Sequence, residues 1–198
     1  MSYPLKIKNI SIAAGTKKKL EFYISTLKDW NKRFNLTSFS DDKLWDEVVG
    51  NSVIFADTIA DLVPQRSPGE ISLCDVGSGS GIPGIIIKLI MPEIQVDLIE
   101  SNGKKAAFLR EIQKLLKLDG LRVVNKDVRE FALKNKKLYN VVTGRAIGKK
   151  FLKHAFRLVL RGGYVLYYKK TLKEGEFAKE PVSIRNYGGS FVLVWKNG

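Results

Sequence analysis

The sequence predicts an α/β protein in which a doubly wound, mostly parallel sheet follows an N-terminal helical segment. Three observations predict this fold class. With 198 residues, 44% of them hydrophobic, the chain is long enough for one globular domain with an ordinary core. Its first third carries apolar residues at helical spacing, whereas short apolar runs alternate with helical stretches from Ile71 onward. Strands that alternate with helices are typical of βαβ units and hence of parallel sheets.

The first third of the chain is expected to form two helices. Apolar residues three and four positions apart predict the first helix over 16–33. The second is expected to follow Ser40 and Asp41, which can cap it, and to bury one face as far as Ile59. A turn-rich linker with prolines and a glycine comes next, at 65–70. We therefore expect a helical segment, 1–64, packed on a second unit, 71–198.

The remaining elements alternate along this second unit. Apolar runs predict strands at 71–76, 94–99, 121–125, 139–143 and 164–169, and helical patterns lie between them at 83–91, 102–118, 128–136 and 147–160. The tail, 182–196, is typical of a hairpin of two more strands around Tyr187-Gly188-Gly189. Parallel sheets of this kind bind ligands at the carboxyl ends of their strands, so the loops that follow the strands are expected to form the site.

The positive charge of the chain is concentrated in its second half. Residues 1–100 carry 11 basic and 13 acidic side chains, and residues 101–198 carry 23 and 7, so the net charges are −2 and +16. An excess of this size predicts a surface for a polyanion, above all nucleic acid. A solvated lysine-rich surface is the plainer interpretation.

Residue counts exclude several kinds of site. The chain has only one cysteine, Cys74, and one histidine, His154. These counts exclude a disulfide framework and a Cys/His zinc site, and we expect no metal. Cys74 lies within an apolar run and is expected to be a buried thiol. The longest apolar stretch, 82–91, is interrupted by Pro83 and Lys88 and is too short to span a bilayer. An unpaired cysteine and the lack of a signal-peptide core indicate a cytoplasmic protein.

The most informative segment is the loop that follows the first strand of the second unit, DVGSGSGIPG at 75–84. Without a Cβ atom, Gly77, Gly79 and Gly81 can adopt positive φ and let a ligand lie against the backbone amides. Glu100 ends the next strand, where a carboxylate can accept hydrogen bonds from both hydroxyls of a ribose. The loop and the acid together predict a cofactor that contains a nucleoside.

Two cofactors fit this pattern. Residues 79–84 satisfy GxGxxG, and Glu100 lies about 20 residues further on, which is the fingerprint of a nicotinamide dinucleotide. Asp75 favours the other cofactor, because a carboxylate two residues before the first glycine would repel a pyrophosphate but attract the ammonium of S-adenosylmethionine. We therefore expect S-adenosylmethionine, and a nicotinamide-dependent oxidoreductase stays as an alternative.

Two further strand ends contribute candidate residues. Asp127, Val128 and Arg129 follow the third strand, where amides and a carboxylate can meet adenine, and Asp127 is equally suited to cap the next helix. Arg145 ends the fourth strand, beside the expected methyl group. It is the candidate catalytic residue, with the role of holding cofactor or acceptor in place, and a surface arginine is the plainer interpretation.

What the chain lacks narrows the choice of acceptor atom. Methyl transfer to exocyclic amines usually employs an (Asp/Asn)-Pro-Pro-aromatic turn after the fourth strand, where this chain has TGRA at 143–146. Carbon-5 pyrimidine chemistry needs a cysteine nucleophile, and Cys74 lies in a strand. A ring nitrogen such as guanine N7 has a free lone pair and needs positioning rather than a base. The rate is then expected to be nearly independent of pH.

Several segments, taken in order, resemble one family. They are WNKRFNLTS at 30–38, the loop at 75–84, ESNGKK at 100–105 with FLR at 108–110, VVTGRA at 141–146, and LRGG at 160–163 with Lys169. They are similar to the RsmG (GidB) family, which methylates N7 of a guanine in bacterial 16S ribosomal RNA. The similarity runs from Lys28 to Lys196, and the WNKxxNLT segment is not a general feature of methyltransferases.

The resemblance implies a Rossmann-like class I methyltransferase fold and a set of cofactor contacts. S-adenosylmethionine would be contacted by Gly77, Ile82, Val128, Arg129 and Arg145, besides Asp75, Gly79, Gly81, Glu100 and Asp127, whose roles are given above. Ribosomal RNA or a small-subunit particle is the expected partner of a monomer that binds no membrane. The basic half offers six candidate RNA-binding residues: Lys104, Lys105, Lys149, Lys150, Lys153 and Lys169.

The chain departs from the family on the acceptor side. An Arg-His…Asp-Ser element usual on the second helix is replaced by EVVGNS at 47–52, so Glu47, Val48 and Asn51 are altered, and the basic residue expected before the last strand is replaced near Ser190. A protein that keeps the fold and binds RNA with little turnover is therefore the alternative of a different class.

Overall fold

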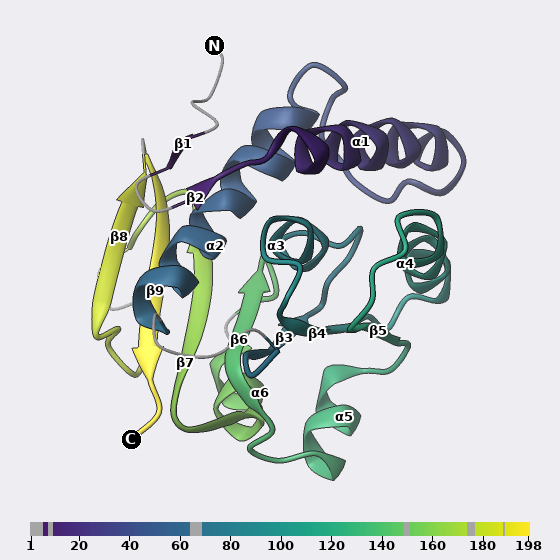
Figure 1. The fold of residues 1–198 in the computed structure, drawn as a ribbon. Coiled ribbons are helices and arrows are strands. Elements are labelled where there is room, and N and C mark those ends of the chain that lie inside the picture. The colour runs from purple at the N-terminus through teal and green to yellow at the C-terminus, as the bar shows by residue number, and fades with distance from the viewer. Residues whose placement is uncertain (1–5, 8–9, 64–68, 149–150, 174–176, 188) are drawn as a thin grey trace.

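A seven-stranded sheet with helices on both faces forms the body of the protein (Figure 1). The computed structural model describes residues 6–7, 10–63, 69–148, 151–173, 177–187 and 189–198. The strand order is β5-β4-β3-β6-β7-β9-β8, and β9 runs antiparallel to both of its neighbours, β7 and β8. The first five of these strands pair in parallel, which confirms the predicted doubly wound, mostly parallel sheet.

The elements follow the predicted alternation. The strands of the sheet are β3 (Ser72–Val76), β4 (Gln95–Ile99), β5 (Leu121–Val124), β6 (Tyr139–Arg145), β7 (Val159–Lys169), β8 (Ser183–Tyr187) and β9 (Ser190–Lys196). The helices are α1 (Ala14–Phe34), the π-helical η1 (Trp45–Gly50), α2 (Asn51–Leu62), α3 (Gly84–Ile90), α4 (Gly103–Leu115), α5 (Val128–Lys134) and α6 (Phe151–Leu158). A short antiparallel pair that the sequence did not predict, β1 (Lys6–Ile7) and β2 (Ile10–Ser11), precedes α1.

Alternate residues of the strands build two apolar cores, one on each face of the sheet. In β3, Leu73 belongs to the core shared with α1, α2, α3 and α4, whereas Cys74 belongs to the core shared with α5 and α6. Val194 and Trp195 divide in the same way in β9. Figure 1 shows the corresponding layers, with α1 to α4 on one side of the sheet and α5 and α6 on the other. Cys74 is a free, fully buried thiol, as predicted.

The N-terminal helices share their core with the sheet. Tyr23 of α1 and Phe55 of α2 are fully buried in the same cluster as Phe108 of α4. The division into a segment 1–64 and a unit 71–198 stays a prediction. Within the described ranges, none of the helices combines the length and the apolar character that crossing a membrane requires.

The second helix begins later than predicted, and without the predicted cap. Asp41 lies in a turn, 41–43, that follows Ser40; helical structure begins at Leu44, directly before η1, and no side chain caps it. The N–H of Asn51 bonds to the carbonyl of Asp46, a five-residue spacing that defines a π-helical turn. Such turns are found frequently at functional sites, and this one carries Glu47.

β7 begins at Val159, where the sequence predicted a helix to residue 160 and a strand from 164. The Gly162-Gly163 pair, which precedes the predicted strand, lies inside β7, at an irregularity of the pairing with β6. Asn197 holds it there: the Gly162 N–H donates to the Asn197 carbonyl (2.6 Å), and the Asn197 N–H donates to the Gly163 carbonyl (2.9 Å). The predicted hairpin of β8 and β9 is confirmed, and Gly188 in its turn lies outside the described residues.

Candidate functional site

The candidate site lies at the carboxyl edge of the sheet, where the strand order reverses between β3 and β6. In the parallel register, Asp75 of β3 is paired with Thr143 of β6, and Val76 is paired with Ile99 of β4 on its other side. The loops that follow β3, β4 and β6 therefore start at the same level. This brings together the glycine loop, Glu100 and Arg145, as the sequence predicts.

The glycines of the loop divide into two kinds. Gly77, Gly79 and Gly81 have φ values of 64°, 59° and 95°, which confirms the predicted left-handed conformation. Gly81 is buried, and a Cβ atom there would lie 2.4 Å from Cγ1 of Ile85, so this glycine is needed for packing on α3. Gly79 is half-buried, and the atom nearest to an added Cβ is the Gly77 carbonyl oxygen at 3.9 Å; Gly77 is exposed, and a Cβ there would lie 3.3 Å from the Ile147 side chain. These two glycines are the ones that can face a ligand.

Asp75 connects the glycine loop to β6 through its side chain. It is fully buried, and its two carboxylate oxygens accept hydrogen bonds from the Thr143 hydroxyl (2.8 Å) and the Gly84 N–H (3.2 Å). Burial raises the pKa of Asp75 to about 7, and the neighbouring charge of Glu100 acts in the same direction. Both carboxylate oxygens thus already accept hydrogen bonds from the loop and from β6. The predicted contact between Asp75 and the ammonium of the cofactor stays a prediction.

Asp75 gives the stability of the protein an unusual dependence on pH. Because its pKa rises from 3.8 to about 7 on folding, the folded state keeps a proton that the unfolded state has released between these pH values. The free energy of unfolding is therefore expected to fall as pH rises through this window, by at most about 1.4 kcal/mol per pH unit, and to lose this dependence below and above it. Urea unfolding at pH 5, 6, 7 and 8 measures the slope.

The variant Asp75→Asn isolates this contribution. The amide can accept from the Gly84 N–H and donate to the Thr143 hydroxyl, and it cannot ionise. We expect its slope between pH 5 and 8 to be smaller than that of the wild type. The control is Asp127→Asn, because Arg129 lowers the pKa of the half-buried Asp127, which then titrates below this window. Equal slopes for the wild type and Asp75→Asn would contradict the assignment.

Glu100 joins the glycine loop to the end of β4. Its Oε2 accepts from the Gly79 N–H and its Oε1 accepts from the Asn102 N–H, both at 2.7 Å, and the residue is 6% exposed. A carboxylate offers about four lone-pair positions, so each oxygen keeps one for a further donor. The amide of Asn125 fastens the end of β5 to the same place by donating to the carbonyls of Glu100 and Ser101.

Asp127, Val128 and Arg129 open α5 beside this point. Asp127 caps the helix by accepting from the Arg129 N–H (2.8 Å), which confirms the capping role predicted for it. Its carboxylate also pairs with the exposed Arg129 guanidinium, with 2.9 Å between Nε and Oδ1, and this hydrogen bond lowers the pKa of Asp127. The predicted contacts with adenine stay predictions for these residues and for the half-buried Ile82.

A tyrosine from the N-terminal helix reaches the loop from outside. The hydroxyl of Tyr23, a fully buried residue of α1, donates to the Ser80 carbonyl at 2.7 Å. Burial raises the pKa of Tyr23, so the phenol stays protonated and remains a donor. Tyr23 is one of the residues whose helical spacing predicts the helix over 16–33, and the sequence analysis gave its hydroxyl no role. Its hydroxyl was the available signal, since a buried tyrosine usually finds a partner.

Arg145 lies between two aromatic rings. Its guanidinium carbon is 5.2 Å from the ring centre of Phe39 and 4.6 Å from that of Tyr168, its neighbour in register on β7. Nη1 donates to the Glu47 carbonyl (2.6 Å) and Nη2 to Glu47 Oε2 (3.3 Å). The side chain is 10% exposed, and this burial lowers the pKa of Arg145. The same arginine, with Phe39 and Tyr168, lines a cavity of about 380 Å³.

The turn after α1 places Phe39 on Arg145. Asn35 ends the helix in the left-handed region, with φ at 48°, and its N–H bonds to the Asn31 carbonyl. The Asn31 side chain then accepts from the Thr37 N–H at 2.9 Å. The two asparagines of the WNKRFNLTS segment thus turn the chain from α1 toward the candidate site.

Family comparison matches residues 16–193 to the model described as GidB, rRNA small subunit methyltransferase G. The chain belongs to this family. The Ribosomal RNA small subunit methyltransferase G of a strain of Staphylococcus epidermidis is 30% identical over 194 residues, which cover 96% of this chain and 79% of the relative. That of a strain of Dehalococcoides mccartyi is 32% identical over 198 residues, covering 98% and 82%.

Membership in the rRNA small subunit methyltransferase G family confirms the expected family, the enzyme class and S-adenosylmethionine as cofactor. Solved structures support the fold alone. A variant of MtNAS in complex with S-adenosylmethionine superposes with a TM-score of 0.61 at 16% identity, over 92% of this chain and 76% of that one. A precorrin-6y methyltransferase from Geobacter metallireducens superposes with a TM-score of 0.52 at 18% identity, over 69% and 85%.

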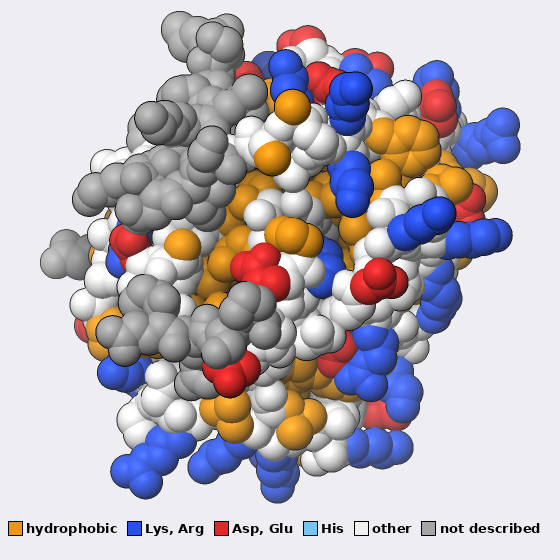
Figure 2. Space-filling view, viewed as in Figure 1, with side chains coloured by type: hydrophobic (Ala, Val, Ile, Leu, Met, Phe, Trp, Pro, Cys, Tyr) orange, Lys and Arg blue, Asp and Glu red, His pale blue; other side chains and the backbone are white. Residues whose placement is uncertain are grey.

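Four of the six lysines predicted to bind RNA surround the same edge of the sheet. Lys104 and Lys105 start α4 after β4, Lys153 lies in the first turn of α6, and Lys169 ends β7. Lys104 and Lys153 are exposed, Lys105 and Lys169 are half-buried, and Lys149 and Lys150 lie outside the described residues. Basic side chains are not confined to this edge. In the view of Figure 2, they also lie along the outline of the molecule, over α4 and below α5 and α6.

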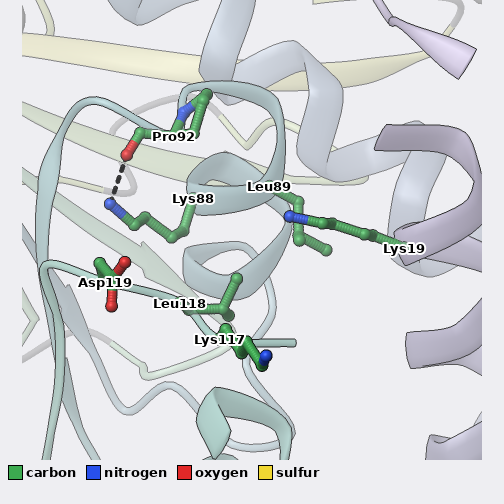
Figure 3. A pocket seen from close by; sticks show the side chains of 7 residues that line it. All are labelled: Lys19, Lys88, Leu89, Pro92, Lys117, Leu118 and Asp119. Atoms are coloured by element: carbon green, nitrogen blue, oxygen red, sulfur yellow. Dashed lines mark hydrogen bonds between the residues drawn. The ribbon is translucent and has the colours of Figure 1, made fainter. Parts of the chain in front are cut away.

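A smaller cavity of about 140 Å³ lies at the amino edge of the sheet, away from the predicted residues (Figure 3). Lys88, 3% exposed, points from α3 toward the loop before β4 and donates to the carbonyls of Pro92 (2.6 Å) and Ile94 (2.7 Å). Burial lowers the pKa of Lys88. Lys88 therefore stabilises the turn between α3 and β4 by donating to its backbone carbonyls.

Proposed function

We propose that this protein transfers the methyl group of S-adenosylmethionine to N7 of a guanine in 16S ribosomal RNA. The observation that carries the proposal is the glycine loop at the reversal of strand order, with Glu100 bound to the Gly79 amide. Family membership supports ribosomal RNA as the substrate class. The choice of N7 rests on the chemistry of the acceptor.

The residues present fit S-adenosylmethionine. Gly77 and Gly79 present backbone without side chains on the accessible side of the loop, and the two free lone pairs of Glu100 suit the two ribose hydroxyls. Val128 and Arg129 at the start of α5 would meet the adenine. The bound cofactor supplies an electrophilic methyl group on a sulfonium. What remains for the protein is to hold the acceptor in line with this methyl group.

Guanine N7 suits a site that moves no proton. Its lone pair is free at neutral pH, so alignment at about 3 Å is the main requirement, and alignment can contribute roughly 7–11 kcal/mol. Arg145 is the catalytic residue that we propose for this alignment. His154 is 9% exposed, and burial lowers its pKa, so that the ring is neutral near pH 7 and no step is assigned to it.

The lysines at the carboxyl edge support RNA as the acceptor. The helix dipole disfavours positive charge in the first turn of a helix, so Lys104, Lys105 and Lys153 do not stabilise α4 and α6 where they lie. They lie where phosphates would pass if a guanine entered beside the glycine loop. We propose that they bind the RNA backbone, and that the protein acts as a monomer in the cytoplasm.

Mass spectrometry of nucleosides tests the proposal. Small-subunit RNA, naked or in the 30S particle, is incubated with the protein and S-adenosylmethionine labelled in its methyl group, and the digested nucleosides are analysed. We expect the label in 7-methylguanosine. RNA binding without label would support the alternative of an RNA-binding module with little turnover. A binding assay in which the protein prefers a nicotinamide dinucleotide to S-adenosylmethionine would support the oxidoreductase.

A further inference from the structure

We propose that Glu47 is a positioning residue of the acceptor side: it holds Arg145 between Phe39 and Tyr168, as a wall of the cavity that receives the acceptor base. The proposal rests on the proposed function and adds to it the place where the base binds. It also separates the acceptor side of the site from the cofactor loop.

Glu47 is the centre of a network that connects four parts of the chain. Its carboxylate accepts from Arg145 Nη2, from the side-chain amide of Asn51 (3.0 Å) and from Lys170 Nζ, and its backbone carbonyl accepts from Arg145 Nη1. Asn51 is in turn within 3.4 Å of the Ser190 hydroxyl, which lies 3.0 Å from that of Tyr168. Glu47, Asn51 and Ser190 are three of the four positions at which the sequence analysis expects a departure from the family, and this network joins them. The other one, Val48, is fully buried in the core.

The pair of Glu47 and Arg145 is buried enough to fix a geometry. The side chains are 17% and 10% exposed, whereas Lys170 is 57% exposed. A guanidinium that is held by a carboxylate and a carbonyl from one residue, with aromatic rings near it, has few other orientations. Lys170 is bound at the rim, where solvent screens the charge, and contributes less to this orientation.

The cavity beside Arg145 has the character of a site for a base. Its volume of about 380 Å³ lies in the range of about 300–1,000 Å³ for small-molecule sites. Phe39, Tyr167 and Tyr168 supply aromatic surface, and Arg145, Lys169 and Lys170 supply positive charge. Enzymes that modify a base bind it outside the stack, between aromatic groups. The remaining N–H donors of Arg145 suit O6 of guanine, which leaves the lone pair of N7 open to the methyl group.

The test compares Glu47→Gln with the wild type. The amide keeps the size of the side chain and loses the charge that holds Arg145. We expect the single-turnover rate of RNA methylation at saturating RNA to fall by about 10-fold, because Arg145 loses the charge-assisted hydrogen bond that orients it toward the base. The Kd of S-adenosylmethionine, measured by calorimetry, is expected to stay unchanged. The matched control is Glu130→Gln, because Glu130 also pairs with two lysines, Lys126 and Lys134, but on the surface of α5.

A double variant separates positioning from a general structural effect. If Glu47 acts through Arg145, Glu47→Gln causes no further loss of rate in the Arg145→Ala background, whereas independent effects would multiply. An unchanged rate in Glu47→Gln, a parallel loss of S-adenosylmethionine affinity, or multiplied effects would each overturn the inference while wild-type methylation upholds the proposed function. A wild type that binds S-adenosylmethionine but methylates no RNA would overturn both.

Discussion

Replacing Arg145 by alanine is expected to slow methyl transfer to RNA by about 100-fold or more while S-adenosylmethionine binds with unchanged affinity. The magnitude follows from alignment, since a displacement of about 1 Å at the reacting atoms can cost about 100-fold in rate. The unchanged affinity follows from the contacts of the guanidinium, which are with Glu47, Phe39 and Tyr168 and not with the glycine loop residues that face a ligand.

Single-turnover methylation and calorimetric titration of the cofactor measure the two quantities for Arg145→Ala. His154→Ala is the control for acid–base chemistry and is expected to keep the wild-type rate between about pH 6 and 8.5. A parallel loss of cofactor affinity in Arg145→Ala would return Arg145 to the cofactor side, which the family resemblance implies. A bell-shaped pH profile that His154→Ala abolishes would contradict a reaction without proton transfer.

Gly79→Val is expected to abolish the binding of S-adenosylmethionine. The φ of 59° at this position disfavours any β-branched residue, and the added side chain would project into the accessible side of the loop rather than into the protein. Cofactor at about 100 times its Kd should stabilise the wild type by roughly 2.7 kcal/mol, which thermal unfolding detects as a raised Tm. The variant is expected to show no such rise.

Gly162→Val is the matched control for the backbone strain. Gly162 has a φ of 78° with no heavy atom within 4 Å of an added Cβ, and it lies in β7, away from the glycine loop. Its rise in Tm with cofactor should equal that of the wild type. Gly81→Val, which would meet Ile85 at 2.4 Å, should in addition lower the Tm without cofactor. A normal rise in Gly79→Val would remove the loop from the binding site.

The sequence predicts best what depends on neighbouring residues. The strands follow from short apolar runs, and the left-handed conformation of Gly77, Gly79 and Gly81 follows from the rarity of that conformation in other residues. The cap of α5 could be predicted because it is local: Asp127 accepts a hydrogen bond from the backbone N–H of Arg129, two residues further along the chain. Prediction fails where a distant residue takes part: the strand predicted from residue 164 begins at Val159, and Asn197 holds Gly162 and Gly163 inside it.

Contacts between distant segments could not be predicted in this way. Glu47 and Arg145 are 98 residues apart, and Tyr23 and Ser80 are 57 apart, so the fold decides whether they meet. The pKa of Asp75 is another such property. The sequence of the loop indicates that a carboxylate lies near a ligand. It does not indicate that burial raises the pKa of this carboxyl group to about 7.

We expect the hydrogen bond from Tyr23 to Ser80 to couple the opening of the N-terminal helix to that of the glycine loop. A loop with three left-handed glycines has large conformational entropy when it is unsupported, and α1 supplies a donor that limits this freedom. Fraying of α1 and loosening of the loop are therefore linked openings of the native state rather than separate ones. A ligand that orders the loop also stabilises a helix that it does not touch, and the helix lowers the entropic cost of binding in return.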